Sequence, residues 1–146
     1  MLFTVKKILL DNNLCVLCTC NNNLPDSSLM LYICDNDCTK IYMLTLKEST
    51  KYLNIINNAN VSLLIDTRDS LQGKRTQIKA LTINGEAFIV QDKDTSRKLI
   101  GQLLLKHDKL VNLASNKNVC VIEILIKDVL FLENVDKGHH ISLSNN

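Results

Sequence analysis

The chain has 146 residues, of which 46% are hydrophobic and 22% charged, and 17 basic against 15 acidic residues leave a formal net charge of +2. This length and composition are typical of one folded domain and exclude a disordered segment. Nucleic-acid surfaces need a concentrated basic stripe or stacking rings, whereas aromatic residues make up only 4% and tryptophan is absent. We therefore expect no nucleic-acid partner.

The start of the sequence, MLFTVKKILLDNN, does not predict a targeting segment. Two lysines precede an apolar run that extends only from Ile8 to Leu10, which is too short for a signal-peptide core. No stretch approaches the ~20 apolar residues of a membrane span. The sequence thus predicts a cytoplasmic protein with no membrane partner, whose six cysteines are reduced thiols.

The first part of the chain predicts a short amphipathic helix and three strands. The helix covers Phe3–Asp11, and its inward residues are expected to be Phe3, Ile8 and Leu9 or Leu10. Apolar runs bounded by the turns NNNLPD and DNDCT predict strands over 14–20, 28–34 and 40–45. We interpret these three strands as an antiparallel meander.

The cysteines of this region resemble metal ligands at first sight. Because alternate residues of a strand share a face, Cys18 and Cys20 lie together and Cys15 points the other way, so one metal would not reach all three. Buried structural thiols are the favoured interpretation, and no metal site is predicted. Cys34 and Cys38 flank the DND turn and could come close enough to bridge on oxidation, although buried thiols remain favoured there too.

The middle of the chain predicts one helix and two strands. The helix ESTKYLNIINN carries an expected buried stripe of Tyr52, Leu53 and Ile56. Strand Val61–Asp66 follows, then the polar loop TRDSLQGKR, and then the long alternating run TQIKALTINGEAFIV. An isolated glycine in such a run, Gly85, indicates a bulge or a close approach of backbones.

The last part predicts a helix pair and a final strand. Asp94 or Thr95 is expected to cap the first helix, whose inward residues are Leu99, Leu103 and Leu104. A second helical piece over 108–114 and a strand over Val119–Leu132 follow. The order of elements favours a mainly β domain over 1–133, an antiparallel sheet with helices to one side, followed by a loose polar tail over 134–146.

The chain also places hydroxyl and lysine side chains at the start of a helix, where backbone N–H groups lack partners and the helix dipole is positive. Ser49, Thr50 and Lys51 could therefore cradle a phosphate. Ordinary helix capping by Ser49 or Thr50, with Lys51 in solvent, accounts for the same pattern. The spacing alone leaves both interpretations open.

A resemblance to a known family comes from a series of motifs between Leu14 and Val90. They are, in order, LCVLCTC, Pro25 with SSLMLYI, IYMLT, STK, NIINNANVSLLID and LTINGEAFIV. Together they resemble the pyridoxamine 5'-phosphate oxidase-like family, the FMN-binding split barrels. The resemblance implies a six-stranded antiparallel split β-barrel and a homodimer that holds its cofactor, FMN, at the subunit interface.

Within that resemblance, eight residues are expected at the flavin. They are Ser28, Leu29 and Met30 along it, Leu44 and Thr45 at its ribityl or ring side, and Ser49 and Lys51 at its phosphate with Thr50 between them. The resemblance thus implies a possible FMN-dependent oxidoreductase or reductase with a small-molecule substrate that the sequence does not identify. No catalytic residue is assigned, because the flavin carries the hydride chemistry.

The chain departs from the family's oxidases in three places. They usually have an arginine where Thr50 stands, and often a glutamine before Gly85, where this chain has Ala80 with Gln77 displaced. The tryptophan and the C-terminal arginine and histidine set that hold pyridoxal phosphate are missing, since no arginine follows Arg97. Authentic pyridoxamine-phosphate oxidation is therefore not expected.

Two alternatives remain beside the flavin enzyme. One is a non-catalytic dimeric binding protein on the same fold, which the missing arginine and glutamine favour. The other is a haem-binding relative that uses His139 and His140, since haem-binding members of this superfamily use a C-terminal histidine. Independently of the resemblance, the runs LCVLCTC and VCVIEILI are too apolar for strands with one wetted face, which favours a homodimer.

Overall fold

The computed structural model describes residues 1–68, 77–133 and 137–143, so the predicted polar loop and the predicted tail lie partly outside the described residues. The described helices are α1 (Leu2–Asp11), α2 (Thr50–Asn57), α3 (Lys93–Lys106) and α4 (Val111–Ala114), with a 3₁₀ turn at Asp108–Leu110. The strands are β1 (Leu14–Asn21), β2 (Leu24–Leu31), β3 (Ile33–Cys34), β4 (Lys40–Leu46), β5 (Asn60–Asp66), β6 (Lys79–Ile89), β7 (Val119–Glu133) and β8 (Lys137–Ser142).

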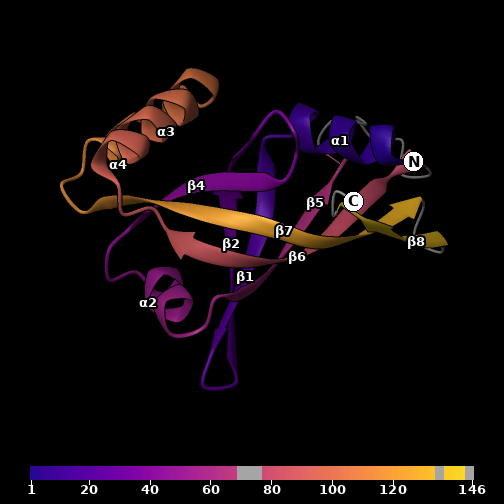
Figure 1. The fold of residues 1–146 in the computed structure, drawn as a ribbon, viewed down its shortest axis with the longest axis horizontal. Helices are drawn as coiled ribbons and strands as arrows, with labels where there is room; N and C mark the ends of the chain where they lie inside the picture. The colour runs from indigo at the N-terminus through magenta and orange to yellow at the C-terminus, as the bar shows by residue number, and fades with distance from the viewer. Residues whose placement is uncertain (69–76, 134–136, 144–146) are drawn as a thin grey trace.

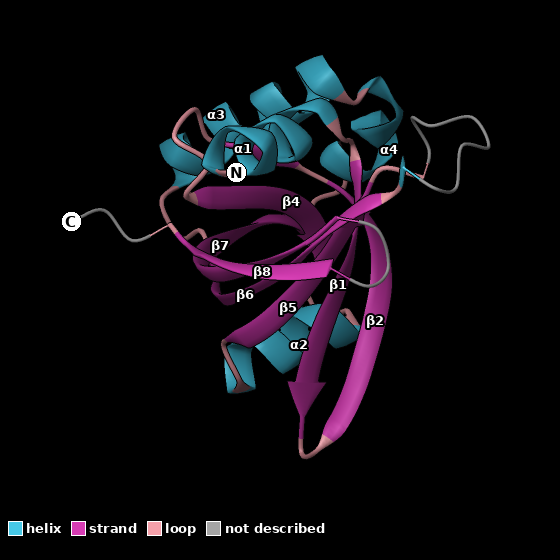
Figure 2. Cartoon of the chain, turned by 90° about the vertical axis from the view of Figure 1, so that its right-hand side faces the viewer, coloured by secondary structure: helices cyan, strands magenta, loops and turns pink. Residues whose placement is uncertain are grey.

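The strands form one curled antiparallel sheet in the order β2-β1-β5-β6-β7-β4-β3, with β8 paired to β7. β2 and β3 stand at opposite ends of this order, yet only Tyr32 separates them in the chain, so the sheet closes on itself (Figure 1, Figure 2). This confirms the predicted mainly β, split-barrel fold. The strand count exceeds six because Tyr32 divides one strand into β2 and β3 and because β8 is added.

The predicted antiparallel meander of the first three strands is confirmed, because the predicted strand over 28–34, divided here into β2 and β3, pairs with β1 through β2 and with β4 through β3. β1 pairs with β2 and β5, whereas β4 pairs with β3 and β7. Tyr32 marks the point where this strand changes partners, because its backbone N–H donates to the Asn13 carbonyl at 3.1 Å and its carbonyl accepts from Nε2 of His107 at 2.7 Å. The N–H of Tyr32 therefore still bonds to the residue before β1, whereas its carbonyl bonds to a side chain that follows α3, and the chain then pairs with β4.

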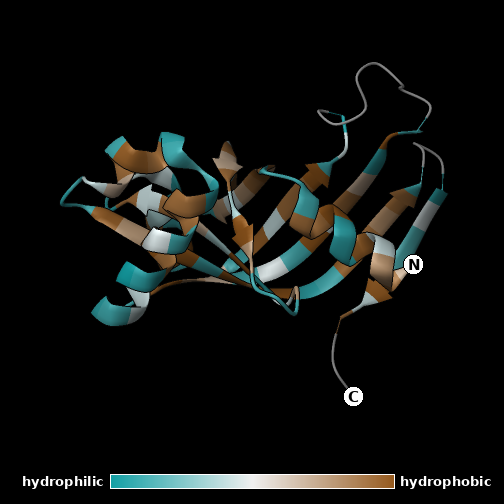
Figure 3. Cartoon of the chain, turned by 90° about the horizontal axis from the view of Figure 1, so that it is seen from above, coloured by the Kyte–Doolittle hydropathy of each residue, from teal (hydrophilic) through white to brown (hydrophobic). Residues whose placement is uncertain are grey.

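The barrel interior holds the main hydrophobic core. Along β1 the side chains of Cys15, Leu17 and Thr19 are buried, whereas Val16 and Cys18 between them are only partly covered. Hydrophobic and hydrophilic residues alternate in the same way along other strands (Figure 3). The alternation confirms that Cys15 faces away from Cys18 and Cys20, and all six cysteines are free thiols.

A second, smaller core lies on the outer face of the sheet beneath α3. It joins Leu99 and Leu103 of α3, which face inward as predicted, to Leu44 of β4 and Val121 of β7. α1, α3 and α4 lie on one side of the barrel and α2 lies at its other end (Figure 2). Most of the run VCVIEILI, which was expected to need a partner subunit, is thus covered within the chain, and Leu125 is 40% exposed.

Two helices bury partly different residues from those predicted, although Ile8 and Leu9 of α1 are buried as expected. In α1 the buried residues are Val5, Ile8 and Leu9, which form an i, i+3, i+4 stripe, and Phe3 falls off that stripe and is 79% exposed. In α2 the buried residues are Asn54 and Ile55, while the predicted Leu53 and Ile56 are exposed. The reason is polar, because Asn54 Nδ2 donates to Thr19 Oγ1 of β1 at 3.0 Å and so sets the rotation of the helix.

Turns, caps and the tail also differ in detail from the predictions. The β1–β2 turn is at Asn22 and Asn23, which have positive φ angles of 50° and 62°, so Pro25 lies in β2. α3 is capped by Asp92, whose carboxylate accepts from Thr95 N at 2.9 Å, in place of Asp94 or Thr95. Part of the predicted loose tail is ordered as β8, because residues 137–142 pair with the exposed edge of β7.

Gly85 marks a register shift in the pairing of β6 with β7, as predicted. A Cβ at this position would lie 2.6 Å from the Leu125 carbonyl oxygen, so the close approach of the two backbones requires glycine. In the described part of the chain, no helix has the length and apolar character needed to cross a membrane.

Candidate functional site

The candidate site lies where β4 passes into α2. After Leu46, the chain turns through Glu48, whose φ is +72°, and Ser49 N donates to the Leu46 carbonyl at 3.2 Å. Lys47 N is held by the Asn118 carbonyl at 2.9 Å, which ties this turn to the start of β7. This tight turn brings Thr45 at the end of β4 next to Ser49 at the start of the helix.

Ser49 is the N-cap of α2. Its Oγ accepts from Tyr52 N at 3.3 Å and lies 2.9 Å from Thr45 Oγ1. Capping, the ordinary role left open by the sequence, is therefore one role of Ser49. When Thr45 donates within the hydroxyl pair, the Ser49 proton stays available to an outside acceptor.

The rest of the helix start is open to a ligand. Thr50 is exposed and Lys51 is half-buried. Among the described residues, neither the backbone N–H of Thr50 nor that of Lys51 has an acceptor, and the Lys51 ammonium makes no ion pair. Two unpaired N–H groups, a hydroxyl and an ammonium at the positive end of a helix are suited to an anion.

The other predicted flavin residues do not all share this surface. Leu44 is 2% exposed and lies beneath α3, on the opposite side of β4 from Thr45. On β2, Ser28 and Met30 pair with the inward residues of β1, whereas Leu29 between them points outward. The structure thus brings Thr45, Ser49, Thr50 and Lys51 together; Leu44 and Leu29 lie on other faces of the sheet.

Two concave regions were not predicted from the sequence. One, of about 400 Å³, lies between the β3–β4 hairpin and α3 and is lined in part by Cys34, Tyr42, Lys98 and Gln102. The other, of about 410 Å³, lies on the outer face of β1, β2 and β5 and includes Leu29. Each joins residues far apart in the chain, so no local sequence pattern marks either one.

Lys47 and Lys51 place positive charges at the candidate site, and the exposed Glu48 lies in the turn between them. Cys120 lies beneath it, with its thiol directed at the Thr45 carbonyl at 3.6 Å, and burial raises the pKa of that thiol while Lys47 lowers it. In the described part of the chain, no group of three or more His, Cys, Asp or Glu residues is arranged to hold a metal ion. The candidate site therefore offers cationic and hydroxyl groups, with one carboxylate, Glu48, in the adjoining turn.

Comparison with known proteins gives a family and a fold. Residues 3–133 match the model of the family described as Pyridoxamine 5'-phosphate oxidase. No curated protein matches the chain. General Stress Protein 26 from Bacillus anthracis shares the fold with a TM-score of 0.71 and 20% identity, over 97% of this chain and 99% of that one.

Two further solved structures differ in what their names say they bind. A FAD-binding protein from Mesorhizobium loti aligns with a TM-score of 0.74 and 16% identity, over 90% of this chain and 93% of that one. HutZ, the haem storage protein from Vibrio cholerae, aligns with a TM-score of 0.73 and 14% identity, over 89% of this chain and 92% of that one. Identities this low establish the fold alone.

Proposed function

Because the chain belongs to the pyridoxamine 5'-phosphate oxidase family, we propose that it binds FMN and serves as a flavin-dependent oxidoreductase for a small molecule. The observation that carries the proposal is the cluster of Thr45, Ser49, Thr50 and Lys51 at the start of α2. The FAD-binding neighbour from Mesorhizobium loti adds support that this fold accommodates a flavin.

The residues of the cluster fit a phosphate monoester. The N–H groups of Thr50 and Lys51 have no acceptor among the described residues, so a phosphate oxygen satisfies them without displacing a bond. The Lys51 ammonium supplies a charge-assisted contact, and the buried Thr45 hydroxyl holds Ser49 in place. When bound, the flavin supplies two-electron hydride chemistry.

The substrate differs from pyridoxamine phosphate in this proposal. The chain has no tryptophan and no arginine after Arg97, so it lacks the groups that hold pyridoxal phosphate in the family's oxidases. Because Thr50 stands where those oxidases usually have an arginine, the proposed phosphate-binding cluster at the start of α2 also has one cation fewer. A non-catalytic role on the same fold is the outcome if FMN binds without turnover of any donor.

The proposal includes a homodimer, because the outer face of β1, β2 and β5 carries uncovered apolar side chains. Val16 of β1 pairs directly with Leu29 of β2 on one side and Leu64 of β5 on the other. Leu29 is 69% exposed and Leu64 38%. A two-fold partner that places the same patch against this one buries both.

A titration of the purified chain with FMN and with riboflavin tests whether this cluster binds the phosphate. Lys51→Ala removes a contact of roughly 1.5–3 kcal/mol, so FMN should bind about ten- to a hundredfold more weakly while riboflavin is unaffected. Lys93→Ala, which removes the lysine that opens α3, is the matched control and should change neither ligand. Equal losses of affinity for FMN and riboflavin would show that Lys51 does not contact the phosphate. A chain that binds no flavin contradicts the proposal.

A haem-binding function is the second candidate, because β8 orders the two tail histidines. His139 packs on the buried Phe131, with ring centroids 6.4 Å apart, whereas His140 is exposed on the opposite face of the strand. Only His140 is therefore presented to a ligand outside the barrel. If haem binds, His140→Ala should shift the Soret band of the haem-loaded protein and His139→Ala should not; a chain that takes up no haem eliminates this candidate.

A further inference from the structure

The β3–β4 hairpin holds two thiols close together. Cys34 ends β3, and Cys38 lies in the turn before β4 with a positive φ of 56°. The Cys38 N–H donates to the Asp35 carbonyl at 3.0 Å, which folds the turn back toward β3. The two cysteines are four positions apart in this turn, where Cys38 is part of the barrel core and Cys34 packs against that same core.

Asp35 fixes the shape of this hairpin. One carboxylate oxygen accepts from Thr39 N at 2.8 Å and from Lys40 N at 2.9 Å, and the other accepts from Thr39 Oγ1 at 2.9 Å. The Asp35 N–H in turn donates to the Lys40 carbonyl at 3.0 Å. The turn between the two thiols is thus held in one conformation before any covalent bond forms.

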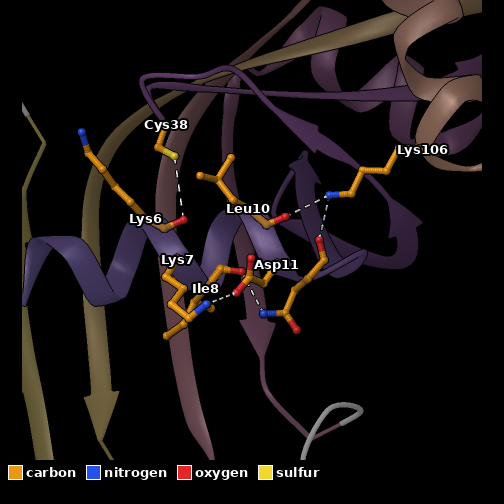
Figure 4. A network of polar contacts seen from close by, with 8 residues as sticks. Lys6, Lys7, Ile8, Leu10, Asp11, Cys38 and Lys106 are labelled. Atoms are coloured by element: carbon orange, nitrogen blue, oxygen red, sulfur yellow. Dashed lines mark hydrogen bonds and ion pairs between the residues drawn. The ribbon is translucent and has the colours of Figure 1, made fainter.

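The two thiols differ in access. Cys34 is half-buried and lines the concave region of about 400 Å³ beside α3, which also contains Lys98 and Gln102. Cys38 is fully buried, and its thiol is directed at the Lys6 carbonyl of α1 at 3.9 Å (Figure 4). A small oxidant entering the concave region therefore meets Cys34 first.

From this geometry we infer that Cys34 and Cys38 form a reversible intrachain disulfide, with Cys34 as the thiol that reacts first and Cys38 as the resolving thiol. A peroxide is the oxidant class in the first step. The Cys34 thiolate attacks a peroxide oxygen, which leaves a sulfenic acid and one molecule of alcohol or water. Cys38 then attacks the Cys34 sulfur, the S–S bond forms and water leaves, so two thiols lose two electrons and the peroxide gains them.

The surroundings of both thiols make this reaction slow at neutral pH. Burial raises the pKa of Cys34 most, and Cys38 and Asp35 raise it further, whereas Lys106 of α3 lowers it. Burial also raises the pKa of Cys38, with Lys6 of α1 acting against it and Asp35 and Asp37 adding to it. Since the thiolate is the nucleophile, the initial rate of oxidation should rise about tenfold per pH unit between about pH 7 and 9.

Mass spectrometry of the peroxide-treated full chain tests the disulfide. After alkylation, the wild type should carry two fewer alkyl groups than the untreated chain, and peptide mapping should link residue 34 to residue 38. Cys120→Ser, which alters a buried thiol on β7, should leave this link intact. A treated wild type with no such link, or with its bond between other cysteines, overturns the inference.

Trapping with dimedone tests the order of the steps. In Cys38→Ala the sulfenic acid has no resolving thiol, so Cys34 should accumulate the dimedone adduct. In Cys34→Ala, the buried Cys38 should accumulate at least tenfold less adduct under the same conditions. Circular dichroism checks that each variant is folded. Equal trapping of the two residues contradicts the assigned order, and the wild-type peptide map remains a test if either variant unfolds.

Discussion

At the scale of single residues, Tyr32 shows how one side chain shapes the topology. It is fully buried, its hydroxyl donates to the Leu9 carbonyl of α1 at 2.7 Å, and its own carbonyl accepts from His107 beyond α3. Three segments of the chain therefore meet at one residue. The sequence shows an aromatic residue in an apolar run there, and nothing local indicates that the strand is interrupted at that point.

Gly85 and Gly101 form a matched pair for a prediction about backbone packing. Gly85→Ala places a Cβ 2.6 Å from the Leu125 carbonyl oxygen, so the β6–β7 pairing must shift and the free energy of unfolding should fall by about 1–3 kcal/mol. Gly101→Ala adds a Cβ with no atom within 4 Å, inside a helix, and should raise it by about 0.5–1 kcal/mol. Urea unfolding measures both, and a Gly85→Ala chain as stable as the wild type is inconsistent with a tight bulge.

Cys15 leads to a prediction about alkaline pH. Burial raises the pKa of its thiol from the ordinary 9.0 to about 12. Between these values the unfolded chain loses a proton that the folded chain keeps, so stability is fully present below pH 9 and falls as the pH rises toward 12. For one such group the loss is roughly 1.4 kcal/mol per pH unit.

The variant Cys15→Ala isolates this contribution. Its free energy of unfolding should fall less steeply than that of the wild type between about pH 9 and 11, by roughly 1.4 kcal/mol per unit, although the variant starts lower because of its cavity. Urea unfolding at about pH 8, 10 and 11 under reducing conditions gives both slopes. Parallel slopes mean that the Cys15 thiol titrates equally in the folded and unfolded chains.

At the scale of elements, the docking of α2 rests on a buried polar contact. Asn54→Ala leaves the buried Thr19 hydroxyl without its Asn54 partner and should lower the free energy of unfolding by about 1–3 kcal/mol. Asn57→Ala removes a similar amide on the exposed face of the same helix and should change it by no more than about 0.5 kcal/mol. Urea unfolding of the two variants side by side separates docking from helix propensity, and equal costs show that the Thr19 contact does not position the helix.

The contact between Asn54 and Thr19 also illustrates which parts of the structure could be predicted from the sequence and which could not. Most strands could be located from apolar runs bounded by turns, and β6 from alternation, because one face of each strand lines the core, as in the run around Leu17. The rotation of α2 was missed because hydropathy ranks Leu53 above Asn54, and only the distant Thr19 reverses that order. β8 was missed because its residues are polar and its pairing partner, β7, supplies the reason for its order.

The candidate site, like the fold, could be predicted only where its residues are close together in the sequence. Thr45, Ser49 and Lys51 lie within one short stretch of chain, so their proximity could be predicted from a strand that ends just before a helix. Leu44 and Leu29 were grouped with them through the family resemblance, whereas alternation along β4 and β2 turns both side chains to other faces. The concave region beside Cys34 needs the apposition of α3 and β3, which no local pattern indicates.

At the scale of the whole molecule, the chain covers one outer face of its barrel and leaves another open. α3 buries Leu44 and Val121 on β4 and β7. On the outer side of β1, β2 and β5, Val16 is only partly buried, while Leu29 and Leu64 are exposed. In the proposed homodimer this open face is the interface, and an obligate interface of this kind buries on the order of 2,000 Å² or more.

Leu29→Asp tests that assignment without disturbing the core, because Leu29 is 69% exposed in the single chain. The wild type should have about twice the chain mass of 16.5 kDa by light scattering at micromolar concentration, and the variant should have the mass of one chain. A buried, unpaired carboxylate on each side of a two-fold interface is costly enough to separate the subunits. FMN affinity should fall with it, since the resemblance places each flavin between two subunits.

Leu105→Asp is the control, because Leu105 is a 90% exposed leucine on α3, outside the open face of β1, β2 and β5. It introduces the same charge on a leucine that is even more exposed than Leu29, and it should leave both the mass and the FMN affinity unchanged. A monomeric mass for the wild type would contradict the proposed homodimer. A dimer that survives Leu29→Asp but separates with Leu105→Asp moves the interface to the α3 side, where Leu44 and Val121 already lie beneath the helix.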